Sequence, residues 1–372
     1  MIYLDNNATT RLAPEVGAVI ADAWRSGLVN PASQHRGGQQ ARRALEDARL
    51  AILTFLGART VGWRPDRLVF TSGGTEANNW ALAGLTRPGQ QVLVSAIEHP
   101  SILATAQHLA ALNIDVRLIP VDVAGVVRLD ELSDLLRRQP TSLVAVMAAN
   151  NETGVIQPIA EIARLAHEAG ALVHCDAVQW VGKLPTTFAD WGVDSLSVSC
   201  HKFHGPVGVG ALCLRDGVTP RPLLFGGFQE DGWRPGTVPL PLVLGFAAAC
   251  RLFSADVSPQ LTMRRDRLET QLRDYLRIEV NGSTAKRLPH TSNVAFLGCD
   301  RQALLLAADR YDLCLSTGSA CSSGSSERSP VLLAMGLPTE IVDSSVRFSV
   351  GRDTSLEEID CAVEILRLIC ST

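Results

Sequence analysis

Lysine is scarce in this chain. Among 372 residues there are only three, Lys183, Lys202 and Lys286, although lysine and arginine together number 34. No run of basic residues is present, and no basic patch is interleaved with aromatic side chains, which make up 5% of the chain. Because such patches are the usual footprint of nucleic-acid binding, we expect no direct nucleic-acid partner.

Long hydrophobic runs are missing as well. The most apolar stretch, from Val238 to Leu252, is short and interrupted by prolines, whereas a membrane-spanning helix needs about 20 mostly apolar residues. The first seven residues lack the basic and apolar regions of a secretory signal. We therefore expect a cytoplasmic protein that has no membrane partner.

The cysteines do not have the number or spacing of a disulfide framework. There are nine, an odd number, with no Cys-x-x-Cys pair, which fits reduced thiols in the cytosol. A metal hydrolase could use Cys200, His201 and His204 as ligands, but Lys202 stands among them and no carboxylate has the spacing of a further ligand. We expect no metal site.

What the chain does contain is an alternation of short apolar runs and amphipathic stretches between about Arg67 and Arg215. This alternation is typical of a mostly parallel sheet covered by helices. Seven strands are predicted, at Arg67–Thr71, Gln91–Ile97, Val116–Val121, Leu143–Ala149, Leu172–Asp176, Ser195–Ser199 and Gly210–Leu214. Helices are predicted between them, notably at Thr75–Leu85, Leu129–Arg138 and Ile159–Ala169.

After Gly245 the pattern changes to two long helical segments and then to shorter elements. These are a strand at Asn293–Leu297, a helix around Leu304–Asp309, a strand at Val346–Val350 and a last helix from Leu356. The length, with 46% hydrophobic and 19% charged residues, fits a soluble enzyme of two domains. The sequence predicts an α/β fold: a large domain of residues 16–255 on a seven-stranded, mostly parallel sheet, and a smaller α+β domain of residues 1–15 and 256–372.

Lys202 follows the sixth predicted strand, between two histidines and next to a phenylalanine. A lysine held among apolar residues loses proton affinity and becomes a usable nucleophile, and a Schiff base is its obvious use. Lys183 and Lys286 are poorer candidates, because the first closes an apolar strand and the second lies in a polar loop. The alternative is that arginine has replaced lysine throughout and that Lys202 remains by chance.

Polar residues follow several of the other predicted strands, where ligands bind in open parallel sheets. Gly74 and Thr75 open a helix and suit a phosphate, although ordinary capping explains them as well. Asp176 ends the fifth strand and needs a cation; if the cofactor is pyridoxal phosphate, Asp176 would keep its ring nitrogen protonated. The alternative is a helix cap. His99, after the second strand, could stack on a ring or move protons, and the alternative is a structural role. Asn151, after the fourth strand, could bond a phenolate or carboxylate, although asparagine is also common in turns.

Two further residues stand apart from these strand ends. Cys321 lies in the Ser- and Gly-rich segment 316–326 and offers a thiol, but no basic residue flanks it before Arg328. Its activation would therefore come from the bound substrate or from closure of the loop. Arg347 is a charge within an apolar strand, which favours a bidentate partner such as a substrate carboxylate or, alternatively, an internal salt bridge.

Together these motifs resemble the cysteine desulfurase family, in the class-V aminotransferase group of pyridoxal-phosphate enzymes of fold type I. The resemblance follows the family order through residues 4–10, 71–78, 150–154, 176–183, 199–210, 318–321 and 345–352. The segment Ser-Thr-Gly-Ser-Ala-Cys-Ser-Ser-Gly is similar to the long-loop branch, which includes the housekeeping and nitrogen-fixation desulfurases. Departures from the family pattern are Cys200, Val207 and Phe228, together with Pro235 and Pro239 near Thr237.

The resemblance implies a role for each candidate residue. Lys202 would carry pyridoxal phosphate, Asp176 would pair with the ring nitrogen, Gln179 would bond the ring oxygen and His99 would stack on the ring as a catalytic residue. The phosphate would be held by Gly74, Thr75, Ser199, His201 and, from the second subunit of a homodimer, Thr237. Asn151 and Arg347 would bind the carboxylate of L-cysteine.

The implied reaction converts L-cysteine to L-alanine and leaves the sulfur on Cys321 as a persulfide. A sulfur-acceptor protein, such as an iron–sulfur scaffold or a thiolation partner, would then collect it. The alternative is a selenocysteine lyase or another class-V aminotransferase or lyase, which would use Lys202 and Asp176 but would not need Cys321.

Overall fold

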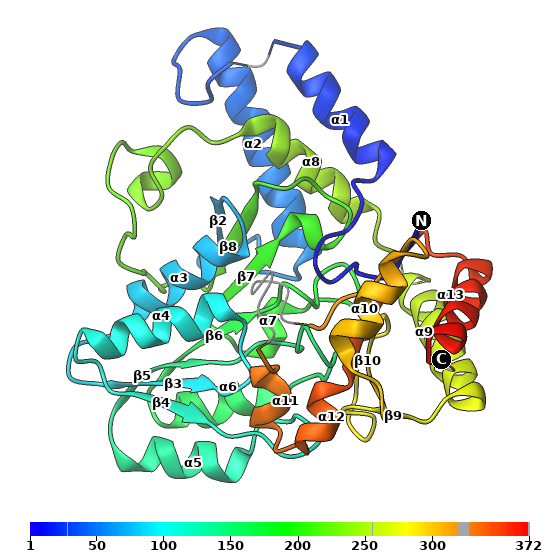
Figure 1. The fold of residues 1–372 in the computed structure, drawn as a ribbon. Coiled ribbons are helices and arrows are strands. Elements are labelled where there is room, and N and C mark those ends of the chain that lie inside the picture. Colours follow the sequence, from blue (N-terminus) through cyan, green and yellow to red (C-terminus); the bar gives the residue numbers. More distant parts are fainter. Residues whose placement is uncertain (28, 255, 319–326, 371–372) are drawn as a thin grey trace.

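The computed structural model describes residues 1–27, 29–254, 256–318 and 327–370, and its largest element is a seven-stranded sheet (Figure 1). In spatial order the strands are β2 (Arg67–Thr71), β8 (Gly210–Leu214), β7 (Ser195–Ser199), β6 (Leu172–Asp176), β5 (Thr141–Ala145), β3 (Gln91–Ser95) and β4 (Val116–Ile119). Strand β8 runs antiparallel to both of its neighbours, β2 and β7, and the other neighbouring pairs in this sheet are parallel. The predicted α/β fold with a mostly parallel seven-stranded sheet is confirmed.

Apart from the edge strand β4, the strands of this sheet are largely buried, and their successive side chains enter two cores on opposite faces. Leu93 and Val144 pack into one hydrophobic core, whereas Val92 and Leu143 pack into the other. The second core is covered by α3 (Gly74–Leu85) and α4 (Pro100–Ala111), and the first by α2 (Arg36–Phe55), α5 (Leu129–Arg138), α6 (Ile159–Glu168), α7 (Phe188–Trp191) and α8 (Leu240–Arg251). Helix α1 (Pro14–Arg25) packs on α8.

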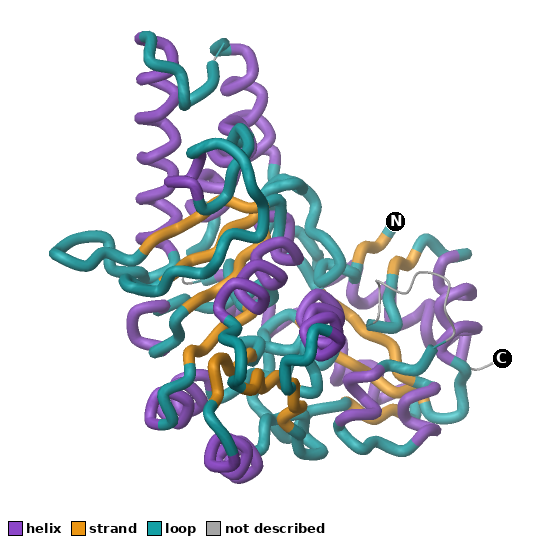
Figure 2. The backbone as a smooth tube through the Cα atoms, turned by 90° about the vertical axis from the view of Figure 1, so that its left-hand side faces the viewer, coloured by secondary structure: helices purple, strands orange, loops and turns teal. Residues whose placement is uncertain are grey.

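A smaller antiparallel sheet has the order β12 (Ser345–Ser349), β10 (Thr291–Phe296) and β9 (Ile278–Val280). Its hydrophobic core also takes in Leu4, near the N-terminus, together with residues of α9 (Val257–Tyr275), α10 (Arg301–Asp309) and α13 (Leu356–Cys370). The short strands β1 (Ile2–Tyr3) and β11 (Leu313–Cys314) pair beside it, and α11 (Pro330–Ala334) and α12 (Thr339–Asp343) follow. The N-terminus and helix α13 both lie beside this smaller sheet (Figure 2).

Several elements differ from their predicted bounds. Strands β3, β4 and β5 end two to four residues before the predicted ends at Ile97, Val121 and Ala149. Beyond these strands Ile97, Val121 and residues 146–149 are still buried, so the apolar run marks burial rather than strand pairing. Helix α8 begins five residues before Gly245. No helix within the described ranges is long and apolar enough to cross a membrane.

Candidate active site

A cavity of about 370 Å³ lies where several strands of the main sheet end. Its walls come from the segments that follow β2, β3, β5, β6 and β7, which is the usual ligand-binding edge of an open parallel sheet. The structure brings nine of the predicted site residues to this cavity: Gly74, Thr75, His99, Asn151, Asp176, Gln179, Ser199, His201 and Lys202.

Lys202 reaches the cavity from a short 3₁₀ turn, Cys200–Lys202, directly after β7. Its Nζ donates to the carbonyl oxygens of Asn7, at 2.7 Å, and Ala8, at 2.8 Å. The turn is closely packed, because a Cβ at Gly205 would lie 1.9 Å from Cys200 Sγ. The amine is therefore held at the cavity wall by backbone groups of the N-terminal segment.

Asp176 is 5% exposed, and both of its carboxylate oxygens accept hydrogen bonds. Oδ1 accepts from the backbone N–H of Val178 at 2.9 Å, and Oδ2 accepts from Asn78 Nδ2 at 2.7 Å. Asn78 Oδ1 in turn contacts His174 Nε2 at 3.0 Å and accepts from Ser197 Oγ at 2.5 Å. These bonds fix the orientation of the carboxylate within the wall of the cavity.

The N-terminus of α3 forms the opposite end of the cavity. Its N-cap, Gly73, provides no capping side chain, so the first N–H groups of the helix lack a side-chain cap, and Gly73, Thr75 and Ser199 line the cavity there. A Cβ at Gly74 would lie 2.7 Å from Val178 Cγ2, so glycine allows the helix to approach β6 this closely. This end suits an anion such as a phosphate.

The two histidines of the cavity differ in their surroundings. His99 caps α4, since its Nδ1 accepts from Ser101 N at 3.1 Å, and burial lowers its pKa, an effect that Lys202 increases and Asp176 opposes. Burial, together with the charges of Lys202 and Lys183, lowers the pKa of His201 to about 4. Both imidazoles are therefore neutral near pH 7, and such rings can stack on a planar ligand or donate one N–H.

Gln179 carries a polar atom that the protein leaves without a partner. Its Nε2 donates to the Asn7 carbonyl at 3.1 Å, while its Oε1 is buried and makes no hydrogen bond within the described residues. A buried, unpaired amide oxygen is costly unless a ligand supplies a donor. A planar cofactor with a ring hydroxyl, a ring nitrogen and a phosphate therefore fits the donors and acceptors of this cavity.

Arg347 does not line the cavity. It is buried in β12, and its Nη2 donates to Asp5 Oδ1 at 2.6 Å in the internal salt bridge that the sequence left open as an alternative. Its Nη1 donates to the carbonyls of Asn151, at 3.2 Å, and Gly318, at 3.1 Å. Arg347 thus lies directly behind Asn151, which does face the cavity.

Two predicted site residues are not placed in the cavity. Thr237 is exposed and does not line the cavity of its own chain. Cys321 lies outside the described residues. Gly318, before segment 319–326, and Ser329, after it, both lie next to Glu152. A Cβ on Gly318 would lie 2.7 Å from Glu152 Oε2, and Ser329 Oγ donates to the same oxygen at 2.5 Å.

Some residues of the site were not predicted from the sequence. Asn78 lies one helical turn after Gly74 and Thr75, so the periodicity of α3 is a signal that places all three on one face. Glu152 follows Asn151 in the same turn, and no local pattern reveals that Gly318 and Ser329 both lie against its carboxylate. No cluster of three potential metal-ligating side chains occurs in the part of the chain that the structure describes.

Comparisons with known proteins agree along nearly the whole chain. Residues 2–361 match the family model described as aminotransferase class-V. A cysteine desulfurase from Trichormus azollae is 42% identical over 373 residues, which cover 98% of this chain and 92% of that protein. The solved structure of a NifS-like protein from Rickettsia africae has a TM-score of 0.91 at 32% identity, and each chain is completely covered. A structure of SspA in complex with cysteine has a TM-score of 0.83 at 31% identity and covers 94% of this chain and 99% of that one.

Proposed function

Because this chain belongs to the aminotransferase class-V family, in its cysteine desulfurase branch, we propose that it uses pyridoxal phosphate to convert L-cysteine to L-alanine. The sulfur would pass to Cys321 as a persulfide. The observation that carries this proposal is the meeting of the Lys202 amine and the buried Asp176 carboxylate in one cavity. Cysteine desulfurase relatives and a related structure with bound cysteine support the choice of substrate.

Each end of the cavity would hold one part of the cofactor. Lys202 would bind it covalently through Nζ, Asp176 would hold a proton on the ring nitrogen, and Gln179 would bond the ring oxygen. The phosphate would be held by the N–H groups of α3 together with Gly74, Thr75, Ser199 and His201. When bound, the cofactor supplies an electron sink for the charge that develops at Cα of the substrate.

The residues of the chain then move protons and bind the substrate. The amine of Lys202 would take the proton from Cα of L-cysteine, with the neutral His99 imidazole beside it. Asn151 would bind the substrate carboxylate at the cavity wall. Arg347 would contribute either by direct contact, if it leaves Asp5, or through the Asn151 backbone that it already holds.

The sulfur step needs Cys321 within reach of the cavity. Its thiolate would attack the substrate sulfur, forming an S–S bond while the Cβ–S bond breaks; the electron pair stays with carbon, which takes up a proton to give alanine. Gly318 bonds to Arg347, which in turn bonds to the cavity residue Asn151. Since three residues span about 10 Å when extended, this anchoring supports transfer to Cys321.

We also propose how the molecule is organised. Residues 16–255 would form the cofactor-binding domain, and residues 1–15 and 256–372 the second domain. The separate core around Leu268 and Phe348 supports this division, although Val331 and Leu332 pack with the core of the main sheet. The protein would act in the cytoplasm and deliver its sulfur to an acceptor protein, for iron–sulfur assembly or for thiolation.

We propose that the protein forms a homodimer in which Thr237 of each subunit completes the phosphate site of the other. Thr237 is exposed, and the nearby side chains of Phe225 and Phe228 are 88% and 94% exposed. Large exposed aromatic side chains on one segment favour a protein interface. Light scattering of the purified protein tests this, and a monomer at micromolar concentration would contradict it.

Replacement of Cys321 tests the proposed reaction. In Cys321→Ala, release of sulfide from L-cysteine in the presence of a thiol reductant should fall at least about 100-fold, while cofactor binding persists. Cys361→Ala, which removes an exposed thiol of α13, is the matched control and should behave as the wild type. Unchanged sulfide release by Cys321→Ala would instead indicate another class-V lyase.

A further inference from the structure

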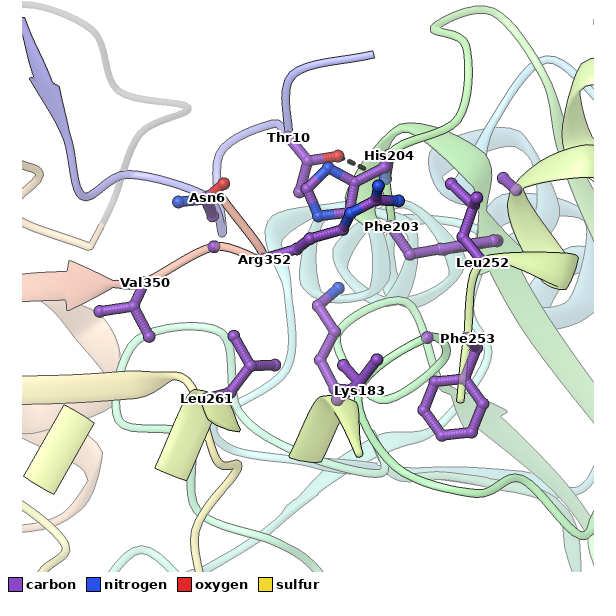
Figure 3. A pocket seen from close by; sticks show the side chains of 14 residues that line it. Asn6, Thr10, Lys183, Phe203, His204, Leu252, Phe253, Leu261, Val350 and Arg352 are labelled. Atoms are coloured by element: carbon purple, nitrogen blue, oxygen red, sulfur yellow. Dashed lines mark hydrogen bonds between the residues drawn. The ribbon is translucent and has the colours of Figure 1, made fainter. Parts of the chain in front are cut away.

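Lys183 lies beside a second cavity, behind the turn that carries Lys202. The cavity, of about 30 Å³, has room for a water molecule, and its walls are mostly apolar side chains such as Phe203, Leu252 and Leu261. Figure 3 shows the Lys183 side chain pointing into this space, with His204 and Arg352 also at its edge. Lys183 is 5% exposed, which is unusual for a lysine.

The amine of Lys183 donates a hydrogen bond to the backbone carbonyl of Lys202. Within the described ranges no carboxylate forms an ion pair with Lys183. Burial, together with the charge of Lys202, lowers the pKa of Lys183 to about 7. A buried amine without a counterion is costly, and the group that the Lys183 amine contacts is the Lys202 turn.

The titratable side chains that interact with Lys183 or share its cavity are basic. They are Lys202 and His201 on the turn, His204 on the following loop, His290 before β10, and Arg352 after β12. Arg352 is paired with Glu15, at 2.9 Å, and with Asp353, at 3.5 Å. Since no ion pair neutralises Lys183 among the described residues, its charge and that of Lys202 act directly on each other.

Building on the proposed function, in which Lys202 is the reacting amine, we propose that Lys183 is a positioning residue for Lys202. Its hydrogen bond to the Lys202 carbonyl holds the turn Cys200–Lys202 against the cavity, and its positive charge favours the neutral, nucleophilic form of the Lys202 amine. A neighbouring cation is a known means of activating a lysine. Lys183 itself does not line the candidate active site.

The test compares Lys183→Met with Lys286→Met. Lys286 is an exposed lysine of a loop, so its replacement removes the same charge away from the site. In Lys183→Met, the pH at which the visible absorption of the cofactor-loaded protein changes should rise by about half a unit or more, because the neighbouring cation is gone. The dissociation constant of the cofactor should rise about fivefold or more. Lys286→Met should match the wild type in both measurements.

Lys183→Arg keeps a positive charge at this position at all pH values. It is the second variant for the test if Lys183→Met does not fold. Its absorption change should occur at the same pH as in the wild type or lower, and a change at higher pH would overturn the proposal. So would a folded Lys183→Met that is indistinguishable from Lys286→Met. If the wild type takes up no cofactor, the proposed function itself fails, whereas normal loading with no effect of position 183 refutes this inference alone.

Discussion

Asp176 is held in position by the side chain of a neighbouring helix. Asn78 donates to the carboxylate with its amide nitrogen, and its amide oxygen contacts His174 and Ser197. All four side chains are buried, so each bond is made in a low-dielectric environment, where an unpaired polar group is costly. Asn78 is therefore the residue on which the orientation of the carboxylate depends.

Asn78→Ala should weaken cofactor binding and destabilise the protein. The replacement removes the partner of Asp176 Oδ2 and that of His174 Nε2, while Asp176 Oδ1 keeps its bond from Val178 N. An unpaired buried polar group costs about 1–3 kcal/mol. We expect the dissociation constant of pyridoxal phosphate to rise about 10-fold or more, measured by titration of the cofactor-free protein. Asn79→Ala, on the same helix but outside the cavity, is the control and should leave the dissociation constant within about twofold of the wild type.

At the scale of elements, the sequence predicts the strands of the main sheet because each has an apolar run between polar turns. The ends of β2, β6, β7 and β8 agree with the prediction. The prediction of β5 is less accurate, because residues 146–149 remain buried without continuing the strand. Burial of this kind depends on contacts with distant segments, and an apolar run alone cannot predict those contacts.

The candidate site could be predicted only in part, because some of its contacts also depend on distant segments. The polar residues after successive strands converge because parallel strands share one edge, so Gly74, Asp176 and Lys202 reach one cavity. The partner of Arg347 could not be predicted, because Asp5 is 342 residues away along the chain. Glu152 likewise gains its contacts with Gly318 and Ser329 only through tertiary packing.

The N-terminus of α3 depends on its close approach to β6. In Gly74→Ala the new Cβ would lie 2.7 Å from Val178 Cγ2, and valine has little rotamer freedom to move aside. The helix end should therefore shift, and we expect the dissociation constant of the cofactor to rise about 10-fold or more. Titration of the cofactor-free variant with pyridoxal phosphate measures this effect.

Gly17→Ala is the control for this substitution. Gly17 lies inside α1, and its Cβ would meet only Leu12 Cδ2 at 3.5 Å, an ordinary contact. Alanine should leave cofactor binding unchanged there and stabilise the helix by about 0.5–1 kcal/mol. Equal cofactor affinity in the two variants would show that the spacing between α3 and β6 does not matter.

At the scale of the molecule, the two ends of the chain complete the site. The backbone of Asn7 and Ala8 receives the Lys202 amine, and Asp5 pairs with Arg347 of β12. The segment is held further by Thr10, whose hydroxyl donates to the His201 carbonyl at 2.8 Å. Folding of the smaller sheet and formation of the cavity are therefore linked through this segment.

The stability of the whole molecule should fall in mild acid. Burial lowers the pKa of His174 to about 3, from its usual 6.5. Between these values the unfolded chain binds a proton that the folded protein excludes, so stability is complete above about pH 6.5 and is lost as the pH falls. The contribution of His174 is about 1.4 kcal/mol per pH unit below 6.5.

Urea unfolding of the cofactor-free protein at pH 7, 6 and 5 measures this dependence. His174→Gln should reduce the loss of unfolding free energy between pH 6 and pH 5 by about 1.4 kcal/mol relative to the wild type. His108→Gln, at an exposed position of α4, should keep the wild-type dependence. If the two variants lose stability equally on acidification, His174 is not the buried neutral group described here.

The most direct measurement is to load the protein with pyridoxal phosphate, reduce it with borohydride and map the modified lysine by mass spectrometry. With only three lysines in the chain, each outcome is unambiguous. We predict a pyridoxyl label on Lys202 alone. A label on Lys183 or Lys286 instead, or no stable label on any lysine, would contradict the assignment of Lys202 as the cofactor-binding amine.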